Sequence, residues 1–360
     1  MHFLIVLLAF MIATPVSAQA PQQGKTKKSK KDTAQVALVP HEVAKLFRAD
    51  SPLTLTLTAN MRQLRRDKDA NVPWRAAQVS YVDSSGSTVA VPVRVRTRGI
   101  WRLKNCEFPP LRLNFAKDSA KHTVFAGLDK PKLVTHCRDT DEYETWLLQE
   151  FQLYRVYNLL TPFSNRVRLA RVTYVDSASG KTVATRYAIL QEDPGELASR
   201  LGGIPIEQKG AGPDDLSQQH AALFAVFQYL IGNTDWSISG LHNVELVGMD
   251  TAVVPVAYDF DYAGAVNTRY AAPDPRLPIR RVRDRLFRGY CLTTATYEPV
   301  FELFRARKDS IYALYRDALG QLLPKRAIED TLSYFDDFYE TLSDPRRIKR
   351  EIMENCIPRR

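Results

Sequence analysis

The sequence contains few cysteines and none of the motifs used by cysteine-based metal sites. Its four cysteines form no CxxC or CxxH pair, which argues against a structural zinc site. Beyond the amino terminus no stretch is apolar enough to cross a bilayer, so a multi-span membrane protein is not expected. The chain has no internal repeat and no GxSxG or other hydrolase signature, which argues against the common serine hydrolases.

The one long apolar run lies at the amino terminus. It spans residues 3–12 and is followed by the small residues Val16, Ser17 and Ala18. An apolar segment of this length, closed by small side chains, is typical of a secretory signal peptide cleaved after Ala18. We therefore expect residues 1–18 to be removed and the mature chain to be secreted or periplasmic. The alternative is an uncleaved membrane anchor.

Export predicts that the cysteines form disulfides, because compartments outside the cytoplasm are oxidising. Three pairings are possible for four cysteines, and the sequence alone does not choose among them. We favour the pairing that keeps each bond within one half of the chain, which joins Cys106 to Cys137 and Cys291 to Cys356.

The composition is that of a folded protein with a basic tail. The chain is 45% hydrophobic and 25% charged, with a formal charge of +10. Part of this charge lies in a lysine-rich segment within residues 19–45, which lacks large apolar residues and is predicted to be disordered. The tail either contacts an anionic envelope surface or acts as a solvated spacer. No folded basic face with interleaved aromatics is visible, so no nucleic-acid partner is expected.

The amino half alternates between apolar and polar residues, which predicts strands. The predicted strands are 53–58, 77–82, 91–96, 109–115, 132–136, 167–175 and 185–191. One helix, from about 143 to 160, interrupts them, with apolar residues at helical spacing. Residue Glu150 lies on its apolar face.

The carboxyl half reads as mostly helical. Helices are predicted at 216–231, 297–318, 325–342 and 345–354, a hairpin at 244–257 and a Gly- and Pro-rich connector at 194–213. These patterns predict an α+β protein of two lobes. Residues 46–195 would form a strand-rich N-lobe with one helix, and residues 196–360 a mostly helical C-lobe.

Four polar residues of the carboxyl half form the pattern that carries chemistry. Asp235 follows the first helix, Asn243 precedes the hairpin, and Asp259 and Asp261 follow it. Phosphoryl transfer from a nucleotide needs a carboxylate at the acceptor hydroxyl, and an amide oxygen and a carboxylate that hold a divalent cation. The layout predicts Asp235 as base, Asn243 and Asp259 as ligands of Mg²⁺ or Mn²⁺, and Asp261 as a second carboxylate ligand. The alternative is that these residues only form turns and caps.

Two residues of the amino half complete this pattern. A kinase-like N-lobe needs a lysine on the phosphates and an acid on the neighbouring helix that holds the lysine. Lys132 and Glu150 are the candidates. The alternatives are that Lys132 is a surface lysine and that Glu150 forms a buried ion pair with an arginine.

The chain resembles the CotH kinase family of secreted atypical protein kinases, loosely over residues 91–264. The segments that carry the resemblance are Arg96-Thr97-Arg98-Gly99, Leu111-Arg112-Leu113-Asn114-Phe115, Phe125-Ala126-Gly127-Leu128, Lys132-Leu133-Val134, Gly232-Asn233-Thr234-Asp235, His242-Asn243 and Asp259-Phe260-Asp261. The resemblance implies a two-lobed protein-kinase-like fold, ATP with a divalent metal, and phosphorylation of hydroxyls on an exported protein. It maps the loop carboxylate onto Asp235 and the metal-binding carboxylate onto Asp259.

Two further residues are assigned to the nucleotide. No ordinary Gly-rich phosphate loop is present, and Arg98 with Gly99 is the nearest substitute. Glu192 closes a strand where the two lobes would meet, near the nucleotide's base and ribose, or else it belongs to a turn before Pro194. The rival functions are a non-catalytic binding or assembly protein with the same fold and an enzyme that transfers AMP.

A group of arginines follows the Asp-Phe-Asp segment. Its members are Arg276, Arg280, Arg281, Arg283, Arg285 and Arg288. Arginine pairs well with carboxylate and phosphate, so an acidic or phosphorylated substrate is one expected ligand. A solvated face is the other interpretation. The sequence assigns no oligomeric state.

Overall fold

A computed structural model describes residues 40–69 and 71–359 of the chain. These described residues belong to one compact unit. The expected signal peptide and most of the expected basic tail lie outside the described residues. None of the described helices is long and apolar enough to cross a membrane.

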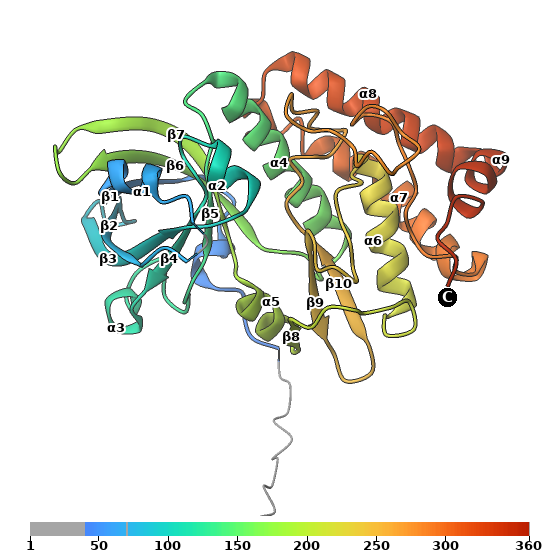
Figure 1. The fold of residues 1–360 in the computed structure, drawn as a ribbon, viewed down its shortest axis with the longest axis horizontal. Helices are drawn as coiled ribbons and strands as arrows, with labels where there is room; N and C mark the ends of the chain where they lie inside the picture. The colour runs from blue at the N-terminus through green and yellow to red at the C-terminus, as the bar shows by residue number, and fades with distance from the viewer. Residues whose placement is uncertain (1–39, 70, 360) are drawn as a thin grey trace, which may run out of the picture. The chain divides into compact units, whose positions relative to one another are not determined.

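The amino half forms a closed barrel of seven strands in the order β1-β2-β3-β4-β5-β7-β6 (Figure 1). The strands are β1 (Leu53–Ala59), β2 (Arg75–Val82), β3 (Thr88–Thr97), β4 (Leu111–Phe115), β5 (Lys132–Val134), β6 (Val167–Asp176) and β7 (Thr182–Gln191). Neighbouring strands pair antiparallel, except that β1 pairs parallel with β6 and so closes the barrel. Their alternating apolar side chains fill the interior, since successive side chains of a strand point to opposite faces.

The expected two-lobed kinase-like fold is therefore wrong. The strand-rich part is a closed mixed barrel, and the carboxyl part is not simply helical, because it contains a three-stranded sheet. Each strand was predicted from its own alternation, but closure depends on the pairing of β1 with β6. More than a hundred residues separate these strands, from Leu53 to its partner Ala170, and alternation within a strand does not encode its partner.

Short helices decorate the barrel and the connections around it. They are α1 (Met61–Arg66), α2 (Trp101–Asn105), α3 (Lys117–Ala120) and α5 (Pro194–Leu201). The region expected to be an irregular connector holds α5 and strand β8 (Ile204–Ile206). Asp193 and Glu196 form a capping box at the start of α5, a signal that the composition of this segment obscured.

The sheet of the carboxyl part has the order β10-β9-β8, with β9 (Val244–Gly248) and β10 (Val253–Ala257) forming the expected hairpin. The helices are α4 (Asp141–Leu160), α6 (Gln218–Ile231), α7 (Thr294–Ala313), α8 (Lys325–Ser343) and α9 (Pro345–Arg347). Helix α4 contacts strands β6 and β7 of the barrel on one side and α7 on another. Its buried residues belong to the same core as those of α6, α7 and α8. Helix α4 thus joins the barrel to the helical part (Figure 1).

Both favoured disulfides are present. Cys106 is bonded to Cys137, and Cys291 is bonded to Cys356. The first bond ties the end of α2 to the segment after β5, and the second ties the segment before α7 to the last described residues. Two disulfides are typical of proteins that fold in an oxidising environment outside the cytoplasm.

Candidate functional site

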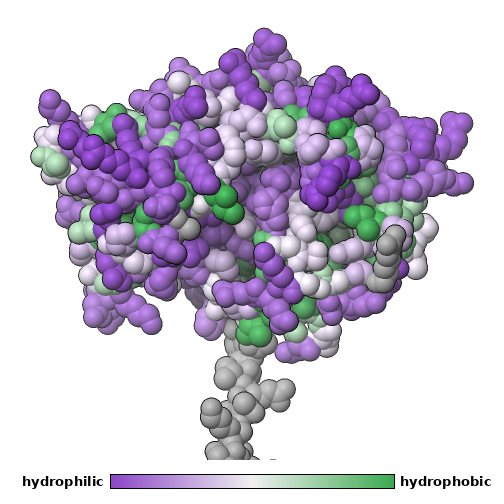
Figure 2. Space-filling view, viewed as in Figure 1, coloured by the Kyte–Doolittle hydropathy of each residue, from purple (hydrophilic) through white to green (hydrophobic). Residues whose placement is uncertain are grey.

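A cavity of about 420 Å³ lies between the barrel and the loops of the carboxyl part. The face drawn in Figure 2 is hollowed between the barrel and the carboxyl part, and both hydrophilic and hydrophobic residues border the hollow. Four of the predicted site residues of the carboxyl part, together with Arg98 from the barrel side, line this cleft: Asp235, Asn243, Asp259 and Asp261. Tyr154 and Tyr258 contribute to its wall. The structure thus brings together residues that are far apart in the sequence.

The first of these residues, Asp235, follows the end of α6. Gly232 caps that helix in the left-handed conformation, and a side chain there would collide with Tyr334. The backbone N–H of Asp235 donates to the Asn233 side chain at 3.0 Å, which fixes the loop. The helix ends at Gly232, as its C-cap signal predicted, and this leaves Asp235 in the loop that follows.

The carboxylate of Asp235 is held by two neighbours. Asn243 Nδ2 donates to Asp235 Oδ2 at 3.0 Å and to its backbone oxygen at 2.8 Å. His242 Nε2 lies 2.9 Å from Oδ1, and this contact raises the pKa of His242. Because the amide nitrogen of Asn243 is used in this way, its amide oxygen is left for another partner.

Asp259 is the more open of the two carboxylates at the end of the hairpin. Its backbone N–H donates to the Tyr154 hydroxyl at 2.9 Å, and 38% of its side chain is exposed. The nearest cationic group is Arg102, with Nη2 3.7 Å from Oδ1. The hairpin brings Asp259 next to Asn243 as predicted, since the N–H of Tyr258 donates to the carbonyl of Asn243.

The backbone around the cleft is unusual. Among the described residues five that are not glycine have positive φ, and three of them line the cleft: Leu241 (51°), Asn243 (52°) and Asp259 (62°). Such conformations cost free energy in residues other than glycine and cluster at functional sites. The fold therefore maintains an unfavourable backbone where the polar side chains meet.

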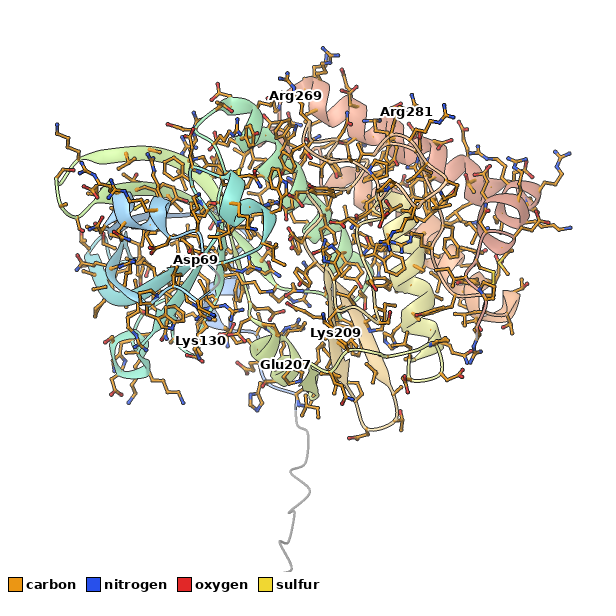
Figure 3. The ribbon with its side chains drawn as sticks, viewed as in Figure 1. Asp69, Lys130, Glu207, Lys209, Arg269 and Arg281 are labelled. Atoms are coloured by element: carbon orange, nitrogen blue, oxygen red, sulfur yellow. A yellow bond between two sulfur atoms is a disulfide. The ribbon has the colours of Figure 1, made fainter. Side chains whose placement is uncertain are left out.

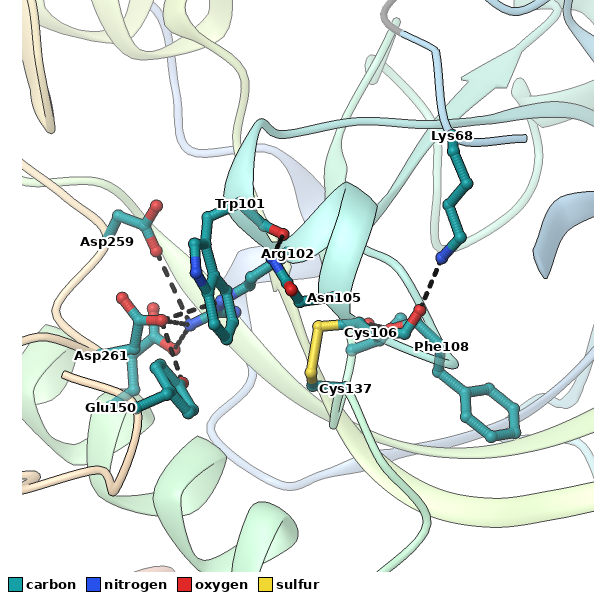
Figure 4. The surroundings of a disulfide bond; sticks show 12 residues. Lys68, Trp101, Arg102, Asn105, Cys106, Phe108, Cys137, Glu150, Asp259 and Asp261 are labelled. Atoms are coloured by element: carbon teal, nitrogen blue, oxygen red, sulfur yellow. Dashed lines mark hydrogen bonds and ion pairs between the residues drawn. A yellow bond between two sulfur atoms is a disulfide. The ribbon is translucent and has the colours of Figure 1, made fainter. Parts of the chain in front are cut away.

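Arg102, on helix α2, is the functional residue that the sequence did not single out. Figure 4 shows its guanidinium among three acids. Nη2 lies 2.8 Å from Glu150 Oε2 and 2.8 Å from Asp261 Oδ2. The sequence signal was indirect: an acid on the apolar face of a helix needs a buried cation as partner.

These buried charges shift one another. Burial raises the pKa of Glu150 to about 7, although the guanidinium of Arg102 opposes this shift. Burial likewise raises the pKa of Asp261, whose carboxylate also accepts a hydrogen bond from the Tyr270 hydroxyl at 3.0 Å. The Asp261 carboxylate is therefore engaged by Arg102 and Tyr270, which does not fit its predicted role as a second metal ligand.

Lys132 has a different partner from the one expected. Its Nζ lies 2.5 Å from Glu245 Oε1 on β9, whereas Glu150 pairs with Arg102. The expected ion pair between Lys132 and Glu150 is thus wrong, because α4 presents Glu150 to helix α2 and not to strand β5. Burial lowers the pKa of Lys132 and the Glu245 carboxylate opposes this effect.

Lys132 belongs to a row of cations on the outer face of the barrel. In the strand register Arg96 is opposite Arg112, and Arg112 is opposite Lys132. Directly paired residues of adjacent strands share a face of the sheet. Arg112 Nε is buried without a hydrogen-bond partner among the described residues. The positive charge of Arg98 lowers the pKa of both Arg112 and Lys132, so Arg98 lies near this row.

Glu192 lies elsewhere. It lines a separate cavity of about 330 Å³, and its carboxylate pairs with Arg200 at 2.7 Å. Its Oε1 also accepts the backbone N–H of Arg166 at 2.7 Å. These contacts give Glu192 a structural environment apart from the cleft, whereas its neighbour Gln191 does line the cleft.

The described residues contain no group of three or more His, Cys, Asp or Glu side chains arranged to hold a metal ion. Magnesium prefers oxygen ligands and keeps several waters, so one or two protein oxygens suffice when substrate phosphates supply the others. Asn243 and Asp259 fit such a cation, since the amide oxygen of one and the carboxylate of the other make no side-chain hydrogen bond to described residues.

No protein-family model matches the chain, and no curated protein sequence matches it at a significant level.

Proposed function

We propose that the chain is an exported phosphotransferase that moves the γ-phosphate of ATP, with Mg²⁺ or Mn²⁺, to a hydroxyl group of an exported protein. The observation that carries the proposal is that Asp235, Asn243 and Asp259 line one cleft together with Arg98. The resemblance of these segments to CotH kinases supports the same chemistry, and we propose that relationship as well. We also propose that the signal peptide directs the chain to the periplasm or the exterior.

The cations at one side of the cleft suit a nucleoside triphosphate: Arg98 lines the cleft, and Arg112 and Lys132 lie near Arg98. Arg98, Arg112 and Lys132 lie close together, and the one carboxylate that pairs with any of them among the described residues is Glu245. This excess of positive charge in a partly buried place attracts phosphate, and arginine binds its oxygens with two parallel hydrogen bonds. The apolar wall of the cleft, which includes Val134, suits a purine base.

The metal position follows from the oxygens that are available. Asn243 and Asp259 would hold the divalent cation, which when bound neutralises charge on the phosphates. Arg102 supplies a permanent positive charge beside Asp259 and Asp261. This charge offsets part of the negative charge of Glu150, Asp259 and Asp261 and so reduces their repulsion of the phosphates.

Asp235 is placed to act on the acceptor hydroxyl. Its carboxylate is oriented by Asn243 and His242, and each of its oxygens keeps a second lone pair. The acceptor oxygen forms a bond to the γ-phosphorus while the bond from that phosphorus to the bridging oxygen of ADP breaks. The hydroxyl proton passes to Asp235, and ADP leaves with the bonding electron pair.

Label transfer from ATP tests the proposal. The mature chain and the variant Asp259→Ala are incubated with γ- or α-labelled ATP, with Mg²⁺ or Mn²⁺, and with envelope proteins as acceptors. We expect γ-label on protein with the unaltered chain and at least a hundredfold loss in the variant, because carboxylates that organise the phosphates act on the transition state (~3 kcal/mol or more).

The matched control is Asp250→Ala, an exposed acid in the turn at the other end of the same hairpin. It should transfer label normally. Transfer of α-label identifies an AMP transferase and contradicts the proposal. Absence of nucleotide binding by a folded chain, checked by thermal unfolding, indicates a non-catalytic binding or assembly protein.

A further inference from the structure

A second and larger cavity, of about 720 Å³, lies between residues of the segment 267–285 and helix α8. We call it the arginine cavity, because five of its lining residues are arginines: Arg269, Arg280, Arg281, Arg283 and Arg285. The one acidic residue in its lining is Asp337. Figure 3 shows Arg269 and Arg281 along the edge of the molecule bordered by α8.

Arg285 forms the fixed part of the cavity. Only 7% of its side chain is exposed, and it donates to the carbonyls of Tyr229 at 3.1 Å and Leu230 at 3.0 Å. Its guanidinium lies 3.6 Å from the centre of the Tyr334 ring and pairs with Asp337 at 2.9 Å. These contacts, together with a hydrogen bond to the Tyr334 carbonyl, hold the arginine in place, so the cavity does not depend on exposed surface side chains alone.

Of the other four arginines, Arg269 and Arg281 form exposed ion pairs, with Glu142 and Asp284, and two have no carboxylate partner among the described residues. Arg280 makes no side-chain hydrogen bond or ion pair with the described residues, and Arg283 reaches only the Asp330 carbonyl at 3.5 Å and the Tyr334 ring. Arg281 pairs with Asp284, but 82% of the arginine side chain is exposed. Exposed pairs of this kind are weak and exchange readily with other anions. The cavity therefore presents uncompensated positive charge.

The arginine cavity and the cleft share a wall. Tyr270 donates its hydroxyl hydrogen to Asp261 at 3.0 Å, and the Thr268 hydroxyl donates to the Asp261 carbonyl at 3.1 Å. The same segment lines the arginine cavity with Asn267, Thr268 and Arg269. Asp261 lines the cleft and Thr268 lines the arginine cavity, so the two cavities adjoin at this hydrogen bond.

We propose that the arginine cavity binds an acidic segment of the acceptor protein and so places a neighbouring hydroxyl at the cleft. The identity of the ligand as an acceptor rests on the proposed function. The chemistry rests on the cavity itself. Five guanidinium groups line it, and two of them, those of Arg280 and Arg283, have no carboxylate partner among the described residues. In a space this large they match a run of carboxylates better than a single small anion.

Direct binding tests the proposal without nucleotide. A fluorescent peptide rich in glutamate and aspartate is titrated with the chain and followed by anisotropy, beside a peptide of equal length with glutamine and asparagine instead. We expect binding of the acidic peptide alone. The double variant Arg280→Gln/Arg281→Gln should weaken it about tenfold, the loss expected for two exposed ion pairs.

The charge-matched control is Arg62→Gln/Arg66→Gln, two exposed arginines of helix α1 on the barrel. It should leave binding within about twofold. Equal loss in both double variants shows general electrostatic attraction and overturns the proposal. So does binding to vesicles of phosphatidylglycerol without binding to the peptide. Asp259→Ala should still bind the peptide. A chain that transfers no phosphate but binds the acidic peptide therefore contradicts the proposed function and not the proposed docking site.

Discussion

The Arg102 guanidinium, from the barrel, lies 2.8 Å from the Glu150 carboxylate, from helix α4. The same guanidinium contacts Asp261, which directly follows the hairpin of the carboxyl part (Figure 4). One cation therefore ties three segments together at the floor of the cleft. Only 12% of the arginine side chain and 1% of the glutamate side chain are exposed, so both partners depend on each other for charge compensation.

Replacement of Arg102 by methionine should strongly destabilise the chain. The variant leaves Glu150 and Asp261 buried without their cation, and loss of one partner of a buried ion pair costs about 3–5 kcal/mol. Urea unfolding at neutral pH measures the change. The triple variant Arg102→Met/Glu150→Gln/Asp261→Asn should recover most of the loss. A single variant as stable as the unaltered chain contradicts this account of the cluster.

The stability that Glu150 confers should depend on pH. Burial raises its pKa from the ordinary 4.5 to about 7, so between these values the folded chain binds more protons than the unfolded chain. Stability from this group is therefore full below pH 4.5 and falls as the pH rises towards 7. Relative to Glu150→Gln, the unaltered chain should lose roughly 2–3 kcal/mol over this range.

Differential measurement isolates that effect, because Asp261 and Glu196 have raised pKa values as well. Free energies of unfolding of both proteins are compared at several pH values from 4.5 to 8. Arg102, Asp261 and Asp259 are the charged groups that face Glu150. A difference between the two proteins that stays constant with pH contradicts the shift.

The contribution of His136 to stability should change with pH in the opposite direction to that of Glu150. It is buried against the rings of Phe108 and Tyr174, and burial lowers its pKa from 6.5 to about 4. The folded chain then binds fewer protons than the unfolded chain, so this contribution is lost as the pH falls from 6.5 to 4, by about 3 kcal/mol. The variant His136→Phe should lack this loss. Thermal unfolding at pH 7 and pH 4.5 compares the two proteins.

Variants of the Lys132–Glu245 ion pair should separate the effect of Lys132 on stability from its effect on nucleotide binding. Lys132→Met leaves Glu245 buried and unpaired, and should cost about 3–5 kcal/mol. Lys132→Met/Glu245→Met replaces the pair by apolar side chains and should restore stability to within about 1 kcal/mol. If Lys132 binds phosphate, ATP affinity by calorimetry falls about tenfold in both variants. Normal affinity in the stable double variant limits Lys132 to a structural role.

The two disulfides should differ in their effect on the cleft. Both close loops, of 31 and 65 residues, and removal of either by paired Cys→Ser changes should cost about 3–4 kcal/mol. Cys106 directly follows helix α2, which carries Arg102. Loss of the bond between Cys106 and Cys137 should therefore also weaken nucleotide binding. Loss of the bond between Cys291 and Cys356 should lower the melting temperature and leave binding unchanged.

The predicted site residues of the carboxyl half meet because they lie close together in the sequence. Asp235 stands just after a helix stop, and a short hairpin separates Asn243 from Asp259. A helix end and a short hairpin, both encoded locally, thus suffice to predict that these positions are neighbours. No local pattern predicts the long-range ion pairs. Lys132 and Glu245 are 113 residues apart, and Arg102 and Asp261 are 159 residues apart.

The sequence by itself predicted the longer strands and helices and the favoured pairing of the four cysteines. Periodicity and cap residues act within a few residues, and they decide which segments are strands or helices and which face is buried. Only the tertiary structure decided that β1 closes a barrel by pairing with β6 and that Glu150 meets an arginine instead of Lys132. The physical reason is that an apolar pattern shows only that a face is buried. Which segment packs against that face depends on the packing of parts of the chain that are distant in the sequence.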